Sequence, residues 1–149
     1  ILSVSDAGWP TQTGTTMSRE IIQTANAPSA IGTYVQAVKT PPGSMVFISG
    51  QIPLVPNEDP AAMTLVSADF GEQAHQVFKN LAAVAAASGG SLADCVKLTI
   101  YRIDLGQFAE VNKIMAEYFS EPYPARAAVE ISALPKQAQI EIDAIVVLN

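Results

Sequence analysis

The sequence predicts an α+β fold, a mostly mixed β-sheet with two helices packed on one of its faces. Short β-rich runs stand near both ends of the chain, two longer amphipathic segments lie between them, and one alternating strand separates those two segments. The order strands, helix, strand, helix, strands fits a single domain, because 149 residues are enough to bury one sizeable core.

Three short strand-like runs open the chain, at residues 21–23, 34–39 and 45–48. The turn residues 41–44 (PPGS) separate the last two runs, so we expect these two runs to form a hairpin. Residues 49–53 break the third strand. The stretch 55–64 contains two prolines, an asparagine and an aspartate, and is typical of a loop.

The first amphipathic segment predicts a long helix over about residues 68–88. Ser67 is its expected N-cap, and Gly89-Gly90 follow its end, where glycine suits the left-handed backbone that closes many helices. Apolar side chains recur at helical spacing and form the expected inner stripe, which comprises Phe70, Ala74, Val77, Phe78, Leu81, Val84 and Ala85.

The second half alternates strand and helix. Residues 96–103 alternate in polarity, as expected for a strand with one buried face. Asp104 is the expected cap of a helix over about residues 105–119, and two strands are expected at 127–132 and 139–148. The inner stripe of this second helix comprises Phe108, Val111, Met115 and Tyr118.

The last strand carries apolar side chains on both of its faces. Ile140, Ile142, Ala144 and Val146 point one way, whereas Ile145 and Val147 point the other. Two helices cover only one face of such a sheet, so the other face needs a cover. Our interpretation is a homo-oligomer in which another subunit covers it. A loop folded over that face is the alternative.

The first residues differ in composition from the rest. Residues 1–16 are polar and rich in Gly, Ser and Thr, without the basic start and apolar core of a signal peptide. Residues 17–20 (MSRE) look like a natural start. We therefore expect residues 1–16 to be an appended or vector-derived leader and residues 17–149 to be the single domain. A native extension with Trp9 packed on the domain is the alternative.

Charge and composition narrow the choice of partners. The net charge of −6 repels phosphate backbones and anionic lipid, so we expect neither nucleic acid nor a membrane as partner. No apolar run approaches the roughly 20 residues that span a bilayer. Cys95 is the single cysteine, which excludes an internal disulfide and favours a cytoplasmic location.

Common catalytic motifs are missing. The chain contains no P-loop, no GxGxxG and no CxxC, and its single histidine, His75, excludes a histidine-rich metal site. We interpret His75 as a partly exposed helix residue. We interpret Cys95 as a small buried hydrophobe and not as a nucleophile.

Two charged residues stand in strand contexts and are the candidate chemical groups. Arg126 directly precedes an apolar strand, and Glu141 lies on the strand face that also carries Ile145 and Val147. An arginine in a cleft can grip a carboxylate through two parallel N–H bonds, and a carboxylate in a partly apolar site can hold and deprotonate water. The residues alone leave open an intramolecular salt bridge at the sheet edge.

Five motifs make the chain similar to the RidA (YjgF) family. The similarity runs from about residue 17 to the C-terminus, with the motifs in the family's order. They are NAPSAIGTYVQ at 26–36, ISGQIP at 48–53, PARAAVE at 124–130, LPK at 134–136 and IEIDAI at 140–145.

The resemblance implies a fold, an assembly and a reaction. The fold is a chorismate-mutase-like α+β domain, assembled as a homotrimer with three clefts between subunits. The reaction is hydrolytic deamination of 2-aminoacrylate, 2-iminopropanoate and 2-iminobutanoate to 2-keto acids and ammonia. The resemblance implies no metal and no organic cofactor.

The resemblance also implies residue roles. Arg126 corresponds to the group that binds the substrate carboxylate, and Glu141 to the group that positions water and shuttles protons. The positions expected to bind or line the substrate are Tyr34, Ser49, Gly50, Asn112 and the backbone of Ala128.

Two residues depart from the family pattern. Thr33 replaces the usual proline, which is expected to loosen the loop before Tyr34, and Ala128 replaces the cysteine of many members, which excludes a thiol switch there.

Two other functions stay open. One is a non-catalytic regulator or chaperone that binds small carboxylates. The other is an endoribonuclease or translation inhibitor, which the acidic charge and lone His75 disfavour.

Overall fold

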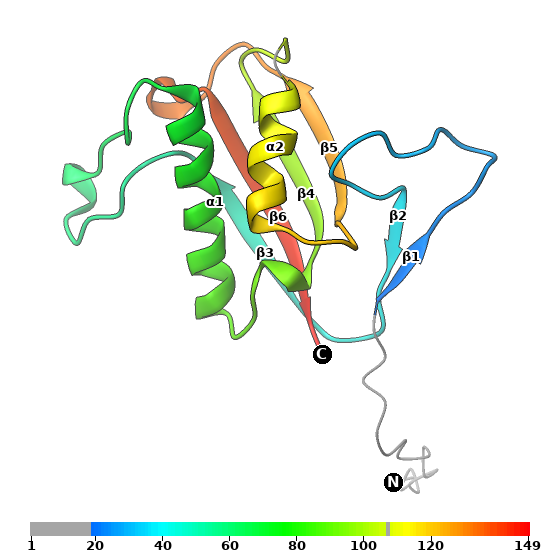
Figure 1. The fold of residues 1–149 in the computed structure, drawn as a ribbon. Coiled ribbons are helices and arrows are strands. Elements are labelled where there is room, and N and C mark those ends of the chain that lie inside the picture. Colours follow the sequence, from blue (N-terminus) through cyan, green and yellow to red (C-terminus); the bar gives the residue numbers. More distant parts are fainter. Residues whose placement is uncertain (1–18, 107) are drawn as a thin grey trace, which may run out of the picture.

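The elements follow the predicted order of strands and helices (Figure 1). A computed structural model describes residues 19–106 and 108–149, so the expected leader at 1–16 lies outside the described residues. The elements are β1 (Glu20–Ile22), β2 (Ala37–Lys39), β3 (Ser44–Gln51), α1 (Phe70–Ala87), β4 (Cys95–Arg102), α2 (Phe108–Tyr118), β5 (Ala125–Glu130) and β6 (Ile140–Leu148). Three short 3-10 turns lie at Pro60–Ala62, Leu92–Asp94 and Pro135–Gln137.

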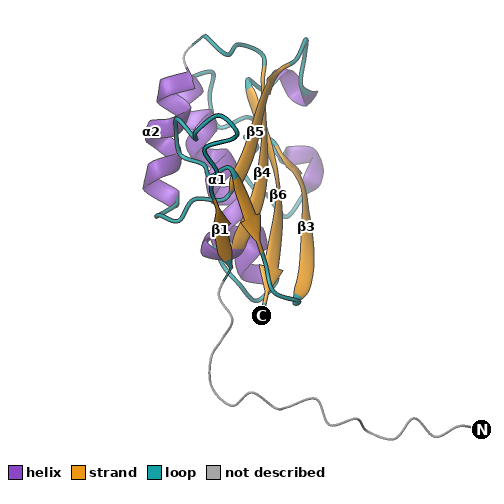
Figure 2. Ribbon diagram, turned by 90° about the vertical axis from the view of Figure 1, so that its right-hand side faces the viewer, coloured by secondary structure: helices purple, strands orange, loops and turns teal. Residues whose placement is uncertain are grey.

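The main sheet is mixed and has the strand order β3-β6-β4-β5. β4 pairs with β5 in parallel, while β6 runs antiparallel to both β3 and β4. α1 and α2 lie side by side on one face of this sheet (Figure 2). The predicted fold class is therefore confirmed.

The start of α1 differs by two residues from the prediction. Asp69 is the N-cap, and its side chain accepts a hydrogen bond from the backbone N–H of Glu72 at 2.9 Å. The expected cap, Ser67, instead accepts from the N–H of Asp69 at 3.1 Å. An aspartate and a serine cap equally well, so propensity did not decide between them. Gly89, with φ of +96°, follows the end of α1 as expected.

The core lies between the helices and the sheet. The stripe of α1 is buried as predicted from Ala74 to Leu81 and at Ala85, whereas Phe70 is only partly buried and Val84 is 37% exposed. Gln73 is an unexpected buried polar residue of α1. Its amide donates to the carbonyl of Ser67 at 2.8 Å and accepts from the N–H of Gln139 at 2.9 Å, so both ends of the amide are satisfied.

The predicted hairpin between residues 34–39 and 45–48 is wrong. β2 pairs with β1 in a separate two-stranded sheet, and β3 pairs with β6 in the main sheet. Residues 41–43 therefore link two sheets. The physical reason is that nine-residue β6 offers β3 a long antiparallel partner, whereas β2 has only three residues. β3 also continues to Gln51, with a register irregularity between Ile48 and Gln51 in place of the expected break.

The face of the sheet opposite the helices carries an exposed apolar surface along β3 and the end of β6. Phe47 is 69% exposed and Met45 is 57% exposed, and they pair in register with Ile145 and Val147 of β6. No loop of the described chain covers Phe47 or Met45, so the alternative of a covering loop does not hold for these residues. We call this surface, formed by Met45, Phe47 and Ile145, the open face.

Candidate active site

Arg126 anchors a pocket between β5, α2 and the loop before β2. Its Nη1 donates to Asn112 Oδ1 at 2.7 Å and to Thr33 Oγ1 at 2.8 Å. The Thr33 hydroxyl in turn donates to Asn112 Oδ1 at 3.0 Å. These three bonds form a closed triangle, which fixes the guanidinium from two segments that lie 79 residues apart in sequence.

Aromatic rings flank the same guanidinium. The Cζ atom of Arg126 lies 4.9 Å from the ring centroid of Tyr34 and 5.0 Å from that of Phe108, within cation–π range. Burial lowers the pKa of Arg126, although an arginine stays protonated at neutral pH. None of the described carboxylates lies within ion-pair distance of it. The pocket of about 450 Å³ is lined by Ile31, Tyr34, Phe108, Asn112, Arg126 and Ala128.

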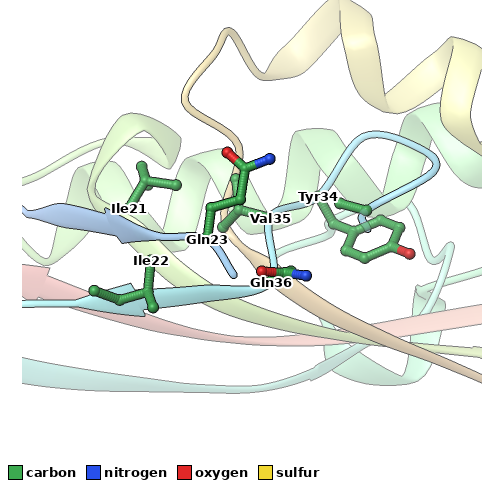
Figure 3. Close-up of a pocket in the computed structure, with 7 residues that line it drawn as sticks. Ile21, Ile22, Gln23, Tyr34, Val35 and Gln36 are labelled. Carbon is green, nitrogen blue, oxygen red and sulfur yellow. The ribbon is translucent and has the colours of Figure 1, made fainter. Parts of the chain in front are cut away.

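Local pairing brings Tyr34 to this pocket. Val35 forms a parallel bridge with Ala125, and its N–H donates to the carbonyl of Pro124 at 3.2 Å. In Figure 3 the ring of Tyr34 points away from Ile21 and Ile22 of β1. A smaller cavity of about 170 Å³ separates Tyr34 from β1, and Figure 3 shows most of its lining: Ile21, Ile22, Gln23, Ala30, Tyr34, Val35 and Gln36.

Glu141 occupies a different place on the sheet. It alternates along β6 with the fully buried Ile140 and Ile142, so its side chain stands on the side away from the helices. Gly50 lies directly beside it, since a Cβ on Gly50 would meet Glu141 Oε1 at 2.5 Å. Burial raises the pKa of Glu141, and the negative charge of Asp143 raises it further.

The predicted site residues thus fall into two groups. Arg126, Tyr34, Asn112 and Ala128 line one pocket on the helix side of the sheet, which we call the arginine half-site. The second group lies on the opposite face of the sheet. In it Gly50 stands beside Glu141, and Ser49 precedes Gly50 at the irregular end of β3. We call Ser49, Gly50 and Glu141 the glutamate half-site.

The two half-sites do not meet within one chain. Arg126 contacts α2, whereas Glu141 lies on the opposite face of the sheet, with β4 between β5 and β6. The possible salt bridge between Arg126 and Glu141 is absent among the described residues. Arg126 also lies inside β5 and not before it, because β5 begins at Ala125.

Two contributors to the arginine half-site were missed at the sequence level. Phe108 was assigned only to the core stripe of α2, although it lies four residues before Asn112 and so shares its helix face. Thr33 was expected to loosen its loop. Its side chain instead ties the loop to Arg126 and Asn112.

The other candidate groups stay outside both half-sites. His75 Nδ1 lies 2.9 Å from the hydroxyl of Tyr118, and its side chain is 38% exposed, as predicted for a partly exposed helix residue. Cys95 is buried, and burial raises the pKa of its thiol to about 12, so it is no nucleophile at neutral pH.

Within residues 19–106 and 108–149, no group of three His, Cys, Asp or Glu is placed to hold a metal ion. None of the described helices has the length and apolarity to cross a membrane.

Comparison with known proteins gives one consistent family. A family model described as Endoribonuclease L-PSP matches residues 24–148. Protein DfrA of Myxococcus xanthus is 50% identical over 88% of this chain and 97% of its own length. The human 2-iminobutanoate/2-iminopropanoate deaminase is 41% identical over 87% of this chain and 90% of its own. RidA from an Antarctic Psychrobacter superposes with a TM-score of 0.64 at 47% identity, over 87% of this chain and 99% of its own.

Proposed function

The chain belongs to the RidA family, which includes reactive intermediate deaminases, and on this basis we propose that it hydrolyses 2-imino acids. The proposed substrates are 2-aminoacrylate, 2-iminopropanoate and 2-iminobutanoate, and the products are 2-keto acids and ammonia. One observation carries the proposal: Arg126 is fixed in an open pocket and has no carboxylate partner among residues 19–106 and 108–149, so its charge is available to an anionic ligand.

Arg126 binds the carboxylate of the substrate. A hydrogen bond to a charged group contributes roughly 1.5–3 kcal/mol, and a planar guanidinium also orients the ligand that it holds. Tyr34 and Phe108 restrict the guanidinium on two sides and give the pocket an apolar wall. The imine carbon, directly attached to the carboxylate, is therefore held at a defined position above the pocket.

Glu141 acts on the water. Its raised pKa makes the carboxylate a better base than an ordinary glutamate. Water adds to the imine carbon and forms a C–O bond while one of its protons passes to Glu141. As the C=N π bond opens, Glu141 returns this proton to the nitrogen, which gives a carbinolamine with one hydroxyl and one amino group. Glu141 then takes the hydroxyl proton and passes it to the amino group, the C–N bond breaks with its electron pair on nitrogen, ammonia leaves and the C=O bond forms. One water is consumed and no oxidant or reductant is needed.

A second copy of the chain brings the two groups together. We propose a homotrimer in which the open face is the contact surface and each cleft combines the arginine half-site of one protomer with the glutamate half-site of its neighbour. The exposure of Phe47 and Met45 supports this assembly, because monomeric proteins rarely expose a contiguous apolar patch. Ser49 and Gly50 form one wall of the cleft, and the backbone at Ala128 holds the water or the imine nitrogen.

The first test couples the protein to a threonine or serine dehydratase and traps the released imine with semicarbazide. The expected result is less trapped adduct and faster release of keto acid, with both effects lost in Arg126→Ala. An unchanged amount of adduct at high protein concentration would rule out imine hydrolysis.

A mixing experiment tests the shared cleft. Arg126→Ala and Glu141→Gln are each expected to be inactive, but trimers reassembled from an equal mixture should recover about one quarter of wild-type activity, because each cleft takes one half-site from each of two neighbours. Assembled mixed trimers without activity would contradict a shared cleft.

The arginine half-site also favours one other function, a carboxylate-binding regulator, because it is assembled without Glu141. Such a regulator would bind 2-oxobutanoate equally well in wild type and Glu141→Gln and would leave the semicarbazide adduct unchanged in both. A deaminase loses only the hydrolysis in Glu141→Gln.

A further inference from the structure

The Nη1 atom of Arg126 has no capacity left for a ligand. Nη1 carries two hydrogens and faces three acceptors, Asn112 Oδ1 at 2.7 Å, Thr33 Oγ1 at 2.8 Å and, more weakly, Met115 Sδ at 3.6 Å. The Thr33 hydroxyl still has its own hydrogen, which it donates to Asn112 Oδ1 at 3.0 Å. Every hydrogen in this triangle is therefore used.

The other edge of the guanidinium is open. In the part of the chain that the structure describes, no hydrogen bond uses Nε or Nη2 of Arg126. Gly32 passes close to this edge, since a Cβ on Gly32 would lie 3.2 Å from Nη2. The missing side chain leaves the approach to Nη2 free. A carboxylate can then bind side-on, one oxygen on Nε and the other on Nη2.

We propose that Thr33 is a positioning residue, whose hydroxyl engages Nη1 of Arg126 together with Asn112 and so presents the Nε–Nη2 edge to the carboxylate of the ligand. The inference rests on the proposed function for the identity of the ligand, a 2-imino acid or its 2-keto acid product. It goes beyond the expectation for this position, because the proline usual there has no hydroxyl.

The role of Thr33 needs both capacities of a hydroxyl. As an acceptor it takes one hydrogen of Nη1, and as a donor it holds Asn112 Oδ1 in place for the other hydrogen. Valine has the shape of threonine without either capacity, whereas serine keeps both. Thr33 also contacts Met115 Sδ at 3.3 Å, so a packing role has to be separated from the hydroxyl role.

The test compares Thr33→Val with Thr33→Ser in two assays. The first is calorimetric titration of the intact assembly with 2-oxobutanoate, the stable product of one proposed substrate. The second is the semicarbazide assay, analysed as separate kcat and KM values. Thr40→Val is the matched control, because Thr40 is exposed and, among the residues that the structure describes, its hydroxyl donates only to the carbonyl of its neighbour Pro41.

The expected result is a loss of about tenfold in 2-oxobutanoate affinity and a similar rise in KM for Thr33→Val, with kcat little changed. KM changes and kcat does not, because Arg126 binds the carboxylate equally strongly in the ground state and in the transition state. Thr33→Ser and Thr40→Val should stay within about twofold of wild type, since they keep the hydroxyl triangle.

Three results would overturn the inference: a Thr33→Val affinity equal to that of wild type, an equal loss in Thr33→Ser and Thr33→Val, or no binding of 2-oxobutanoate by wild type at millimolar concentration. The proposed deaminase activity fails separately, through an unchanged semicarbazide adduct. If that activity fails while Thr33→Val still weakens 2-oxobutanoate, Thr33 positions Arg126 for a ligand that the protein does not hydrolyse.

Discussion

One chain surrounds Arg126 with many more contacts than Glu141, so the two half-sites differ in completeness. Around Arg126 on β5, helix α2 and the loop before β2 supply the hydrogen bonds and two aromatic contacts, and the guanidinium is fixed. Beside Glu141 stands a glycine without a side chain, Gly50, at the irregular end of an edge strand, and no described side chain forms a hydrogen bond or ion pair with the Glu141 carboxylate. The proposed ligand-binding half-site is thus complete within one chain, whereas the proposed chemistry requires a neighbour.

The largest effect is expected when the proposed trimer is disrupted, because only the glutamate half-site comes from a neighbour. Phe47→Glu places a charge at the centre of the open face, where burial of an unpaired charge costs several kcal/mol. We expect monomers in light scattering and a loss of imine hydrolysis of about 100-fold or more, since each cleft would lose its second half. The arginine half-site should keep its fold.

The control for this prediction is Ala86→Glu, on an exposed position of α1 on the helix side of the sheet. It adds the same charge and should leave both assembly and activity as in wild type. A Phe47→Glu variant that remains oligomeric and active would remove the open face from the proposal.

A smaller change addresses the glutamate half-site alone. Gly50→Ala would put a Cβ 2.5 Å from Glu141 Oε1, and the flexible carboxylate must move away. Because a displacement of about 1 Å can cost about 100-fold in rate, we expect a fall of that order in kcat, with an unchanged affinity for 2-oxobutanoate. Gly71→Ala, at the start of α1, is the matched control for a glycine substitution. Equal kcat values in the two variants would contradict the role of Glu141.

The pH dependence should shift in one direction when Asp143 loses its charge. Burial and the charge of Asp143 both raise the pKa of Glu141, so Asp143→Asn leaves only the effect of burial and lowers that pKa. We expect the acid limb of the kcat/KM profile to move to lower pH. Tyr101→Phe is the control: it removes the hydrogen bond of Tyr101 to Asp143 Oδ2 but keeps the charge of Asp143. The acid limb of the kcat/KM profile of this variant should therefore not move to lower pH. An unmoved limb in Asp143→Asn would exclude Glu141 as the titrating base.

The smallest effect is expected in the sheet core, which the proposed chemistry does not use. The buried thiol of Cys95 has a pKa raised from 9.0 to about 12. The unfolded chain therefore binds fewer protons than the folded chain between these pH values, and the free energy of unfolding falls with rising pH, by about 1.4 kcal/mol per pH unit from this group. Cys95→Ala should lack this contribution in urea unfolding while keeping full activity near neutral pH. Equal alkaline slopes in the two proteins would contradict it.

Local patterns in the sequence predicted the helices and the strands that flank them. Most of the stripe from Phe70 to Ala85 is buried, and the alternation of Ile140 and Ile142 against Ile145 in β6 gives the two faces of the sheet correctly. These features depend on spacing within one segment. The pairing of β3 with β6, across almost one hundred residues, depends on the competition between distant partners, and the turn at 41–44 gave the wrong one.

The candidate site was predicted residue by residue but not as a geometry. Motif resemblance selected Arg126 and Glu141, and no spacing along the chain showed that they lie on opposite faces of one sheet. The register that pairs Arg126 with buried Leu98 and Glu141 with Tyr101 is set by three strands together. Thr33 was missed for a related reason, because its partners Asn112 and Arg126 are remote in sequence.

The small β1–β2 sheet has a consequence for local unfolding. Its strands are three residues each. The bridge from Val35 to Ala125 joins the loop between β1 and β2 to the edge of the main sheet, and Arg19, directly before β1, donates to the carbonyls of Cys95 and Pro122. Such a unit can open with a lower free energy than the global unfolding of the core. Its amide hydrogens should therefore exchange with solvent well before those of β4 and β6. Tyr34 lies in the loop between β1 and β2, so an opening that also breaks the bridge from Val35 to Ala125 would move Tyr34 away from Arg126 and expose one side of the pocket to solvent.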